Sequence, residues 1–300
     1  MNCGKLLAGL ALGALLASPV AAQTRASEDE TIVVTGTRMT RGEAFEMARR
    51  YTRAVLAIPQ ADQNARWAEP LCIGAIGLRP EVATPLIDRI EATARNVGAR
   101  VARGECAPNV LLLFVLDSDS VYAEVELKRS DLLQTSTKEQ RRTLSQPGLP
   151  VRWFYGQVIE GLGGRGLTQN APALGQNPAA LLDLPVINEG ALSRLNSPAQ
   201  LSIKGVTVLV DVPRVSNVSF DALSDYLAFG ILSRTRLDAS PDASSIVSLF
   251  QADPQDRPSG MSDLDRAMLK ALYKIPVNRS AAVHRNQMAS EMVKEIAAIQ

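Results

Sequence analysis

The chain of 300 residues has a nearly balanced charge, with 32 lysines and arginines against 31 aspartates and glutamates. Hydrophobic residues make up 46% and charged residues 21%, which excludes a disordered chain or a fibrous repeat. Nucleic acids and anionic membranes attract proteins with a basic excess, so the balanced charge argues against both as partners. The length allows one large domain or two smaller ones.

The first 22 residues show the three zones of a secretory signal peptide. Lys5 precedes an uncharged, mostly apolar run that ends at Val20-Ala21-Ala22, the small residues expected before a cleavage site. This run is shorter than the roughly 20 residues that a membrane span needs. We therefore expect residues 1–22 to be a signal peptide, cleaved after Ala22. The mature chain is expected to be periplasmic or secreted, without a transmembrane segment.

Cysteine usage agrees with export. Removal of the signal peptide takes away Cys3 and leaves Cys72 and Cys106. An even pair of cysteines in an oxidising compartment predicts a structural disulfide bond. The alternatives are weaker, because there is no C-x-x-C redox motif and two thiols without partner histidines make a poor metal site.

The segment after the signal contains a β-branched run, Thr31-Ile32-Val33-Val34-Thr35. With Asp29, Glu30 and Gly36, this run resembles the TonB box of energy-coupled outer-membrane receptors, which pairs with its partner as an added strand. The rest of the chain lacks the many strands of a receptor barrel, so the resemblance implies at most a partner of a TonB-dependent uptake system. The plainer interpretation is an N-terminal strand, or an extended tether over residues 23–38.

Helical spacing of apolar residues predicts helices over residues 41–56 and 81–97. Thr40 and Glu43 have the spacing of a capping box for the first, and Gly98 is a stop for the second. The run from Val110 to Leu116 then predicts a strand buried on both faces, since it is continuously apolar and ends at turn-forming residues.

A polar helix reaching about residue 133 and a surface helix over 135–144 are expected next, although a short strand would also suit residues 121–127. Strands are predicted over 151–159 and 206–212. The glycine- and proline-rich residues 161–178 between them are the only serious candidate for a domain boundary. A helix over 219–234, with Ser219 as its N-cap, opens a helical C-terminal region. These elements predict an α+β fold, a small mixed sheet covered by helices, in which residues 39–300 form a single domain.

The chain from this helix onward resembles the C-terminal tail of matrixin-type metzincin proteases. In that family an H-E-x-x-H-x-L-G helix is followed by a Met-turn and by a last helix that ends in A-L-Y. The matching segments here are Phe229-Gly230, Ile246-Val247-Ser248 and Ser262 to Tyr273, so the match covers about 55 of the 300 residues. The same tail also resembles exported alphaproteobacterial proteins of unknown function. The resemblance implies a zincin-like scaffold.

The zinc-binding residues of that family are missing. The two ligand histidines fall on Leu223 and Leu227, the general-base glutamate on Ser224, and the third ligand on Ser233. A zinc enzyme needs about three nitrogen, oxygen or sulfur ligands and a carboxylate to accept a proton. His284 is the single histidine of the chain, so no other register restores the site. We expect no zinc protease activity, no metal and no cofactor.

Other catalytic patterns are absent or weak. Neither a G-x-S-x-G elbow nor a phosphate-binding P-loop occurs. Asp117 and Asp119 follow a predicted buried strand, where open α/β folds place functional groups, but residues at this spacing more often cap the next helix. Asp211, Asp221 and Asp225 could form a second acidic group.

The leading hypothesis is therefore an exported, non-catalytic accessory or binding protein on a degenerate zincin-like scaffold, with a protein or another component of the cell envelope as partner. A hydrolase that uses Asp and Ser chemistry around Asp117, Asp211 or Asp225 is one alternative. A partner of a TonB-dependent uptake system is another.

Overall fold

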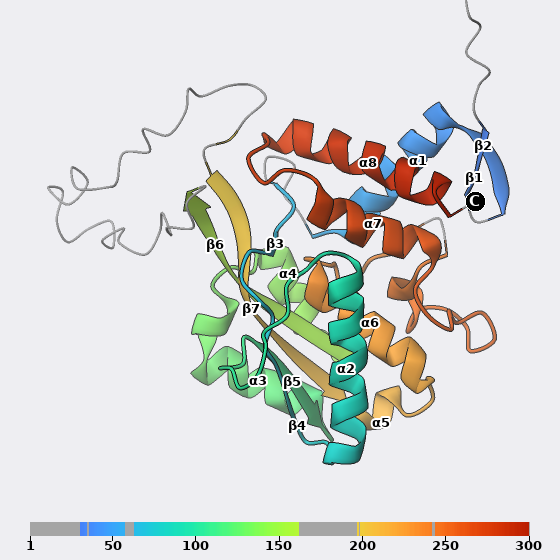
Figure 1. Cartoon of the computed structure of the whole chain (residues 1–300). Helices are drawn as coiled ribbons and strands as arrows, with labels where there is room; N and C mark the ends of the chain where they lie inside the picture. Colours follow the sequence, from blue (N-terminus) through green and yellow to red (C-terminus); the bar gives the residue numbers. More distant parts are fainter. Residues whose placement is uncertain are drawn as a thin grey trace, which may run out of the picture.

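The computed structural model describes residues 31–34, 36–57, 63–161, 197, 199–241 and 244–299. Its helices are α1 (Arg41–Val55), α2 (Pro80–Asn96), α3 (Ser118–Lys128), α4 (Lys138–Leu144), α5 (Val212–Val215), α6 (Phe220–Leu232), α7 (Asp263–Lys274) and α8 (Ala281–Ala297), with 3-10 turns η1 (Ser130–Leu133) and η3 (Ile246–Ser248). Its strands are β1 (Thr31–Val34), β2 (Thr37–Thr40), β3 (Arg66–Trp67), β4 (Ile73–Ile76), β5 (Val110–Val115), β6 (Val151–Gly161) and β7 (Ala199–Asp211). The predicted fold class, a small mixed sheet covered by helices, is confirmed (Figure 1).

Strand β7 is the centre of the main sheet (Figure 1). On one side it pairs in parallel with β5 along its second half and with β3 along its first half, and β4 continues the sheet beyond β5. On the other side it pairs antiparallel with β6 along nearly its whole length. Parallel strands need a crossover connection, and α2 supplies it between β4 and β5.

The strand predicted from Val110 to Leu116 is β5, but its two faces are not equally buried. Val110, Leu112 and Phe114 are buried, whereas the residues between them are only half-buried. The buried face belongs to the large core, and the other face meets a thinner layer of helix. Leu116 itself follows the strand and is largely exposed.

Helices cover both faces of the sheet. The large core unites one sheet face with α2 and α6 and extends into α1, α7 and α8, which pack on one another at one end of the sheet (Figure 1). A smaller core on the opposite face joins α3, η1 and α4 to β6 and β7; its buried residues are Tyr122, Leu133, Leu144, Phe154 and Leu209. The sheet thus lies between a thick helical layer and a thin one.

The helix ends follow local sequence signals. Thr40 and Glu43 form the capping box predicted for α1, and the Ser219 side chain accepts a hydrogen bond from the Ala222 N–H at the start of α6. Gly98 has φ 91°, a left-handed conformation that favours glycine directly after α2. These short-range contacts explain why the helices could be located from the sequence.

The N-terminal segment differs from an extended tether. Residues Thr31–Val34 pair antiparallel with Thr37–Thr40 as a hairpin, and Ile32 and Val34 are buried in the large core. Because the hairpin packs next to α1 and α8, the TonB-box-like run is already paired within its own chain, apart from Thr35, which lies outside the described residues. Residues 1–30 and 162–196, which include the predicted signal peptide and most of the candidate boundary, also lie outside them. Among the described helices, none is long and apolar enough to cross a membrane.

Cys72 and Cys106 form a disulfide, as the sequence predicts. The bond joins the segment before β4 to the loop before β5, so it closes a loop that contains α2. Asn109 supports the same region, because its side chain accepts a hydrogen bond from the Cys72 N–H at 2.8 Å and donates one to the Pro70 carbonyl at 3.0 Å. The disulfide and Asn109 thereby tie the start of β4 to the start of β5.

We expect removal of this bond to destabilise the protein. The loop spans a sequence separation of 34 residues, and a native bond that closes a loop of this size is worth about 2–4 kcal/mol. Replacing both cysteines by serine should therefore lower the denaturant midpoint relative to the oxidised wild type, with a steeper slope because the unfolded chain is no longer cross-linked. Treating the wild type with a reductant should give the same shift, and thiol counting of the untreated mature chain should find no free thiol. An unchanged midpoint in both experiments would show that the bond is dispensable.

Candidate functional site

The helix that matches the zincin motif is packed as a core helix. Leu227 and Ser224 of α6 are fully buried, while Leu223 is half-buried at the margin of the large core. The Ser224 hydroxyl donates to the Phe220 carbonyl at 2.6 Å, and the Ser233 hydroxyl donates to the Phe229 carbonyl at 2.8 Å. These hydroxyls are used by their own backbone, so this face of α6 offers no open ligand site.

Two further segments of the resemblance fold as a turn and a helix. The Met-turn position is the buried 3-10 turn η3, and the last helix is α7, capped by Ser262. Gly230, the glycine of the Leu-Gly match, faces the Trp153 ring of β6, and a Cβ atom there would lie 2.7 Å from the ring. A helix, a turn and a second helix in this order are shared by many folds, and they do not by themselves establish a zincin.

The carboxylates of the two α6 aspartates, Asp221 and Asp225, also have partners within the protein. Asp225 accepts a hydrogen bond from the Met261 N–H at 2.8 Å and forms an ion pair with Arg89 of α2 at 3.2 Å. Arg89 also pairs with Asp221 at 2.8 Å. Asp211 belongs to a different cluster, described next, so the second acidic group considered from the sequence does not form.

The carboxyl ends of β5 and β7 meet at one edge of the sheet, where open α/β folds hold their ligands. Asp117 caps α3 there, accepting from the N–H groups of Asp119 and Ser120 at 3.1 Å. Asp211 accepts from the Ser118 N–H at 3.0 Å and pairs with Arg214 at 3.0 Å. The predicted aspartates thus lie close together, as helix caps and ion-pair partners.

Arg152 of β6 also binds this cluster of charged groups. Its side chain is 1% exposed, and its guanidinium pairs with Asp119 and donates to the Ser118 hydroxyl at 2.6 Å. It also donates to the carbonyls of Leu144 and Gln146 at 2.9 and 2.7 Å. A buried guanidinium held by so many acceptors is a structural group. The sheet edge expected for a hydrolase site is therefore filled by a closed ion network.

The surroundings of Asp119 favour its charged form. The Arg214 guanidinium, the Gly148 N–H and the Arg152 guanidinium, in this order of effect, outweigh partial burial and lower the pKa of Asp119 to about 2. A carboxyl group that stays ionised at all but extreme pH is a poor proton donor and a weak base. This agrees with a structural role for Asp119.

Two other buried polar groups have structural partners. Asp265 of α7 accepts from Tyr51 and Ser245 hydroxyls and from the Ile246 N–H at 2.9 Å, which joins α1, η3 and α7. His284 of α8 is 2% exposed, and burial lowers its pKa to about 3, so it is neutral at physiological pH. Its Nδ1 faces the Asn64 N–H at 3.4 Å. Within the described residues, no group of three or more His, Cys, Asp or Glu side chains could hold a metal ion.

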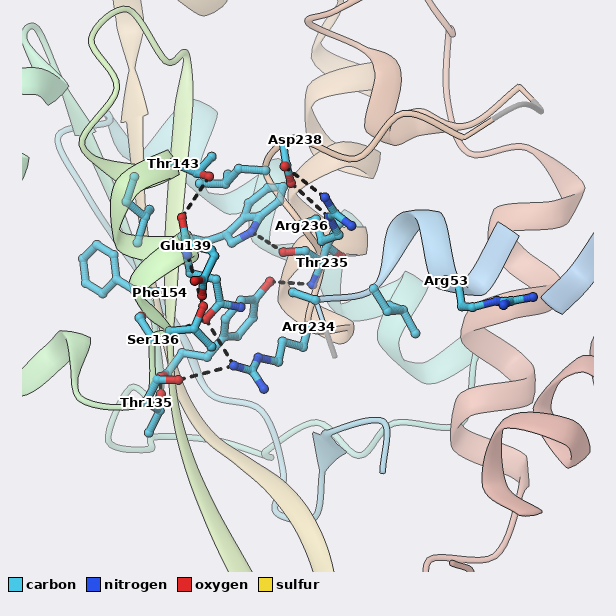
Figure 2. A pocket seen from close by; sticks show the side chains of 18 residues that line it. Arg53, Thr135, Ser136, Glu139, Thr143, Phe154, Arg234, Thr235, Arg236 and Asp238 are labelled. Carbon is cyan, nitrogen blue, oxygen red and sulfur yellow. Dashed lines mark hydrogen bonds and ion pairs between the residues drawn. The ribbon is translucent and has the colours of Figure 1, made fainter. Parts of the chain in front are cut away.

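A cavity of about 530 Å³ lies beside strand β6 (Figure 2). This volume is within the range of small-ligand pockets. Its walls are the C-terminal end of α1, the η1–α4 connection with α4, strand β6, and the segment after α6. The lining residues are Arg53, Leu56, Ala57, Thr135, Ser136, Thr137, Glu139, Gln140, Thr143, Leu144, Trp153, Phe154, Tyr155, Arg234, Thr235, Arg236, Leu237 and Asp238.

Hydrogen bonds fix the floor of this cavity. The Trp153 indole donates to the Thr235 carbonyl at 2.9 Å, and the Tyr155 hydroxyl donates to the Gly230 carbonyl at 2.7 Å. The Arg234 side chain points toward Thr135 in Figure 2 and donates to its carbonyl at 3.3 Å and to the Gln140 side chain at 3.2 Å. The floor therefore links β6 and the η1–α4 connection to the segment after α6, which makes it a rigid base for a ligand.

The rim has both polar and charged groups. Arg236 forms a two-point ion pair with Asp238, with both distances 3.0 Å, so these two charges neutralise each other. Glu139 and Arg53 are exposed on different sides of the cavity (Figure 2). Thr135, Ser136 and Thr143 lie on the same side of the cavity as Glu139 (Figure 2). A mixture of hydroxyl, amide and guanidinium groups around aromatic side chains suits recognition more than bond-breaking chemistry.

Comparison with known proteins adds no further constraint, because no family model, curated protein or solved structure matches this chain. The site is therefore judged on its own chemistry. Sequence reasoning located the aspartates and the α6 positions, but it missed the cavity. The local signal was weak: residues Thr135 to Thr137 form a hydroxyl triplet before a short polar helix, and Arg234 to Asp238 form a charged run after a core helix.

The two leucines of α6 should respond differently to truncation. Leu227 has no exposed surface, so Leu227→Ala should lower the free energy of unfolding by about 2–5 kcal/mol through lost burial and the space left behind. Leu223 is half-buried, and Leu223→Ala should cost less, about 1 kcal/mol. Denaturant midpoints at constant slope measure both. A small loss at Leu227 would contradict a core role for this helix face and reopen it as a ligand site.

The ion network around Asp119 should make the free energy of unfolding depend on pH in the acid range. The pKa of Asp119 is about 2 in the folded protein, against an ordinary value of 3.8 that applies to the unfolded chain. Its contribution is therefore fully present above pH 3.8 and is lost as the pH falls through about 2. Asp119→Asn should be clearly less stable than wild type at pH 6, and the difference should shrink at pH 2.5. Urea titrations at the two pH values test this. Asp88→Asn, on the exposed surface of α2, is the control and should show no such convergence.

Proposed function

We propose that this chain is an exported, non-catalytic binding protein whose ligand occupies the cavity beside β6. The observation behind this proposal is a contrast between two places in the fold. The places where sequence reasoning sought catalysis are closed: the α6 face is packed, and the aspartates of the sheet edge are caps and ion-pair partners. The cavity is the place in the described chain where polar groups, aromatic rings and space of ligand size converge.

The chemistry of the cavity supports binding. Its hydroxyl groups come from Thr135, Ser136, Thr137 and Thr143, and the nearest charged groups are either paired or at the rim. A nucleophilic mechanism needs a hydroxyl or thiol activated by a neighbouring base. Among the described residues the only histidine of the chain, His284, lies in α8 and does not line the cavity. The cavity therefore offers recognition without an evident activated nucleophile.

Export is supported by two independent features. The sequence has the zones of a signal peptide at residues 1–22, and the two cysteines that remain after its removal are bonded to each other. Disulfides persist in oxidising compartments such as the periplasm. Within this proposal the zincin-like tail remains a resemblance. It implies a scaffold that derives from a zincin and in which core residues have replaced the zinc ligands.

The two alternative functions have less support. A hydrolase built on Asp117, Asp211 or Asp225 would need these side chains to be available, yet each accepts hydrogen bonds from backbone N–H groups at a helix or loop start. A TonB-type interaction would need the run from Thr31 to Thr35 to pair with another protein. Four of its residues already pair within the β1–β2 hairpin.

A fragment screen tests the proposal. A mixed library of small organic fragments, observed by ligand NMR, should give hits that bind the wild type and lose binding in Ser136→Trp, because the indole fills the cavity. Leu127→Trp is the matched control: Leu127 is 82% exposed, lies on α3 and does not line the cavity, so hits should be retained.

Trp153 gives a second measurement. The chain has two tryptophans, Trp67 and Trp153, so Trp67→Phe leaves the cavity residue as the only indole reporter. Hits should change its emission. Hits that survive Ser136→Trp, or an absence of hits in the wild type, would show that the cavity is not the ligand site.

A further inference from the structure

Strand β6 forms one edge of the sheet, and its register fixes which backbone groups face outward. The Asp211 N–H donates to the Pro150 carbonyl at 2.9 Å, so Pro150 and Asp211 are a hydrogen-bonded pair. In an antiparallel ladder such pairs alternate along the strand. Arg152 and Phe154 therefore direct their N–H and C=O groups toward β7. Trp153 and Tyr155 direct theirs away from it.

Two other contacts agree with this alternation. Val206, the partner of Tyr155 on β7, donates its N–H to the Asn109 carbonyl at 3.0 Å, on the side of β7 away from β6. On the outer edge of β6 the Tyr155 carbonyl accepts a hydrogen bond from the Thr135 hydroxyl. Among the described residues, the outward N–H and C=O of Trp153 and the N–H of Tyr155 have no backbone partner.

Both Trp153 and Tyr155 line the cavity, so it lies beside this part of the outer edge of β6. An edge strand with open N–H and C=O groups is a template for an added strand. The Tyr155 carbonyl already accepts a hydrogen bond from the Thr135 hydroxyl and is not free to pair with an added strand. Such a strand must therefore be short. A volume of about 530 Å³ also suits a short segment and not a long one.

The charges of the rim indicate what such a segment contains. Three arginines and two acidic residues line the cavity, a net charge of +1; Arg236 is neutralised by Asp238, and Glu139 is exposed on a different side from Arg53. Arg53 donates only to the Arg49 carbonyl, at 3.4 Å, and no carboxylate of the described residues lies within ion-pair distance of it. An exposed guanidinium without a carboxylate partner favours an anionic group on the ligand.

We infer that the cavity binds a short extended peptide segment that bears a carboxylate. Its backbone pairs with the outer edge of β6 at Trp153 and Tyr155, and its carboxylate lies toward Arg53. This inference rests on the proposed function, because it names the ligand class of the same site. It assigns the backbone of β6 to affinity, and the hydroxyl, aromatic and arginine side chains to selection among peptides.

Pools of blocked tetrapeptides test the inference. Two acetylated and amidated pools differ only in a fixed third residue, Glu or Lys, with Ala, Val and Thr mixed at the other positions. Binding to the full mature chain is measured by the shifts of the Trp153 and Tyr155 amide resonances. The Glu pool should bind about five to ten times more tightly than the Lys pool, the factor expected from one exposed charge interaction of about 1 kcal/mol. Equal binding of the two pools would contradict the carboxylate assignment.

N-methylated versions of the Glu pool test the strand pairing. Successive peptide nitrogens in an extended chain face opposite sides, so methylation of residues 1 and 3 or of residues 2 and 4 blocks only one side. One of these two pools should lose binding, and the other should keep it. If both N-methylated pools bind as well as the parent, the ligand backbone does not pair with β6 and the inference is wrong.

Matched arginine variants locate the charge contact. Arg53→Gln should reduce the preference for Glu over Lys to about twofold while the Trp153 amide shift remains. Arg49→Gln, one turn earlier on α1 and not part of the cavity lining, should leave the preference unchanged. If both peptide pools fail to bind while small fragments still bind the wild type and are lost in Ser136→Trp, the binding function stands and the peptide inference fails. If fragments fail as well, the proposed function fails with it.

Discussion

The buried guanidinium of Arg152 is the interaction on which the thin helical layer depends. A charged group at 1% exposure is stable only when its N–H groups are all used, because its transfer from water is costly. Its acceptors come from α3, from the end of α4 and from the loop that leads into β6. One side chain on the sheet thus fixes the position of this whole layer, whose own hydrophobic core is small.

Neighbouring residues at the start of β6 take part in two different arrangements. At its beginning, β6 uses Arg152 to close the carboxyl edge of the parallel strands, and the aspartates gathered there become fixed partners. From the next residue on, the register of the same strand directs the backbone groups of Trp153 and Tyr155 away from β7, and both residues line the cavity. The η1–α4 connection, which provides hydroxyl groups of the cavity wall, is held by other contacts, from Thr135 to the Tyr155 carbonyl and from Arg234 to the Thr135 carbonyl. The carboxyl edge of the parallel strands is therefore closed, while the cavity lies at the outer edge of the neighbouring antiparallel strand.

Local signals in the sequence account for what could be predicted. The Thr40–Glu43 capping box, the Ser219 cap and the spacing of the α6 leucines act over a few residues, and each corresponds to an observed contact. The disulfide followed from cysteine count and compartment. The cavity could not be predicted in this way. Its floor depends on Trp153 meeting Thr235 and on Arg234 meeting Thr135, contacts between residues about 80 to 100 positions apart, and no periodicity of a single segment encodes them.

Gly230 shows how a motif can have a structural reason that differs from the one its family resemblance implies. A glycine inside a helix is usually unfavourable by about 1 kcal/mol relative to alanine. Here the Trp153 ring lies where its Cβ atom would be, and the Gly230 carbonyl accepts the Tyr155 hydroxyl at 2.7 Å. The close approach of α6 to β6 therefore needs a residue without a side chain. The Leu-Gly match to a protease helix is explained in this chain by packing against the strand that lines the cavity.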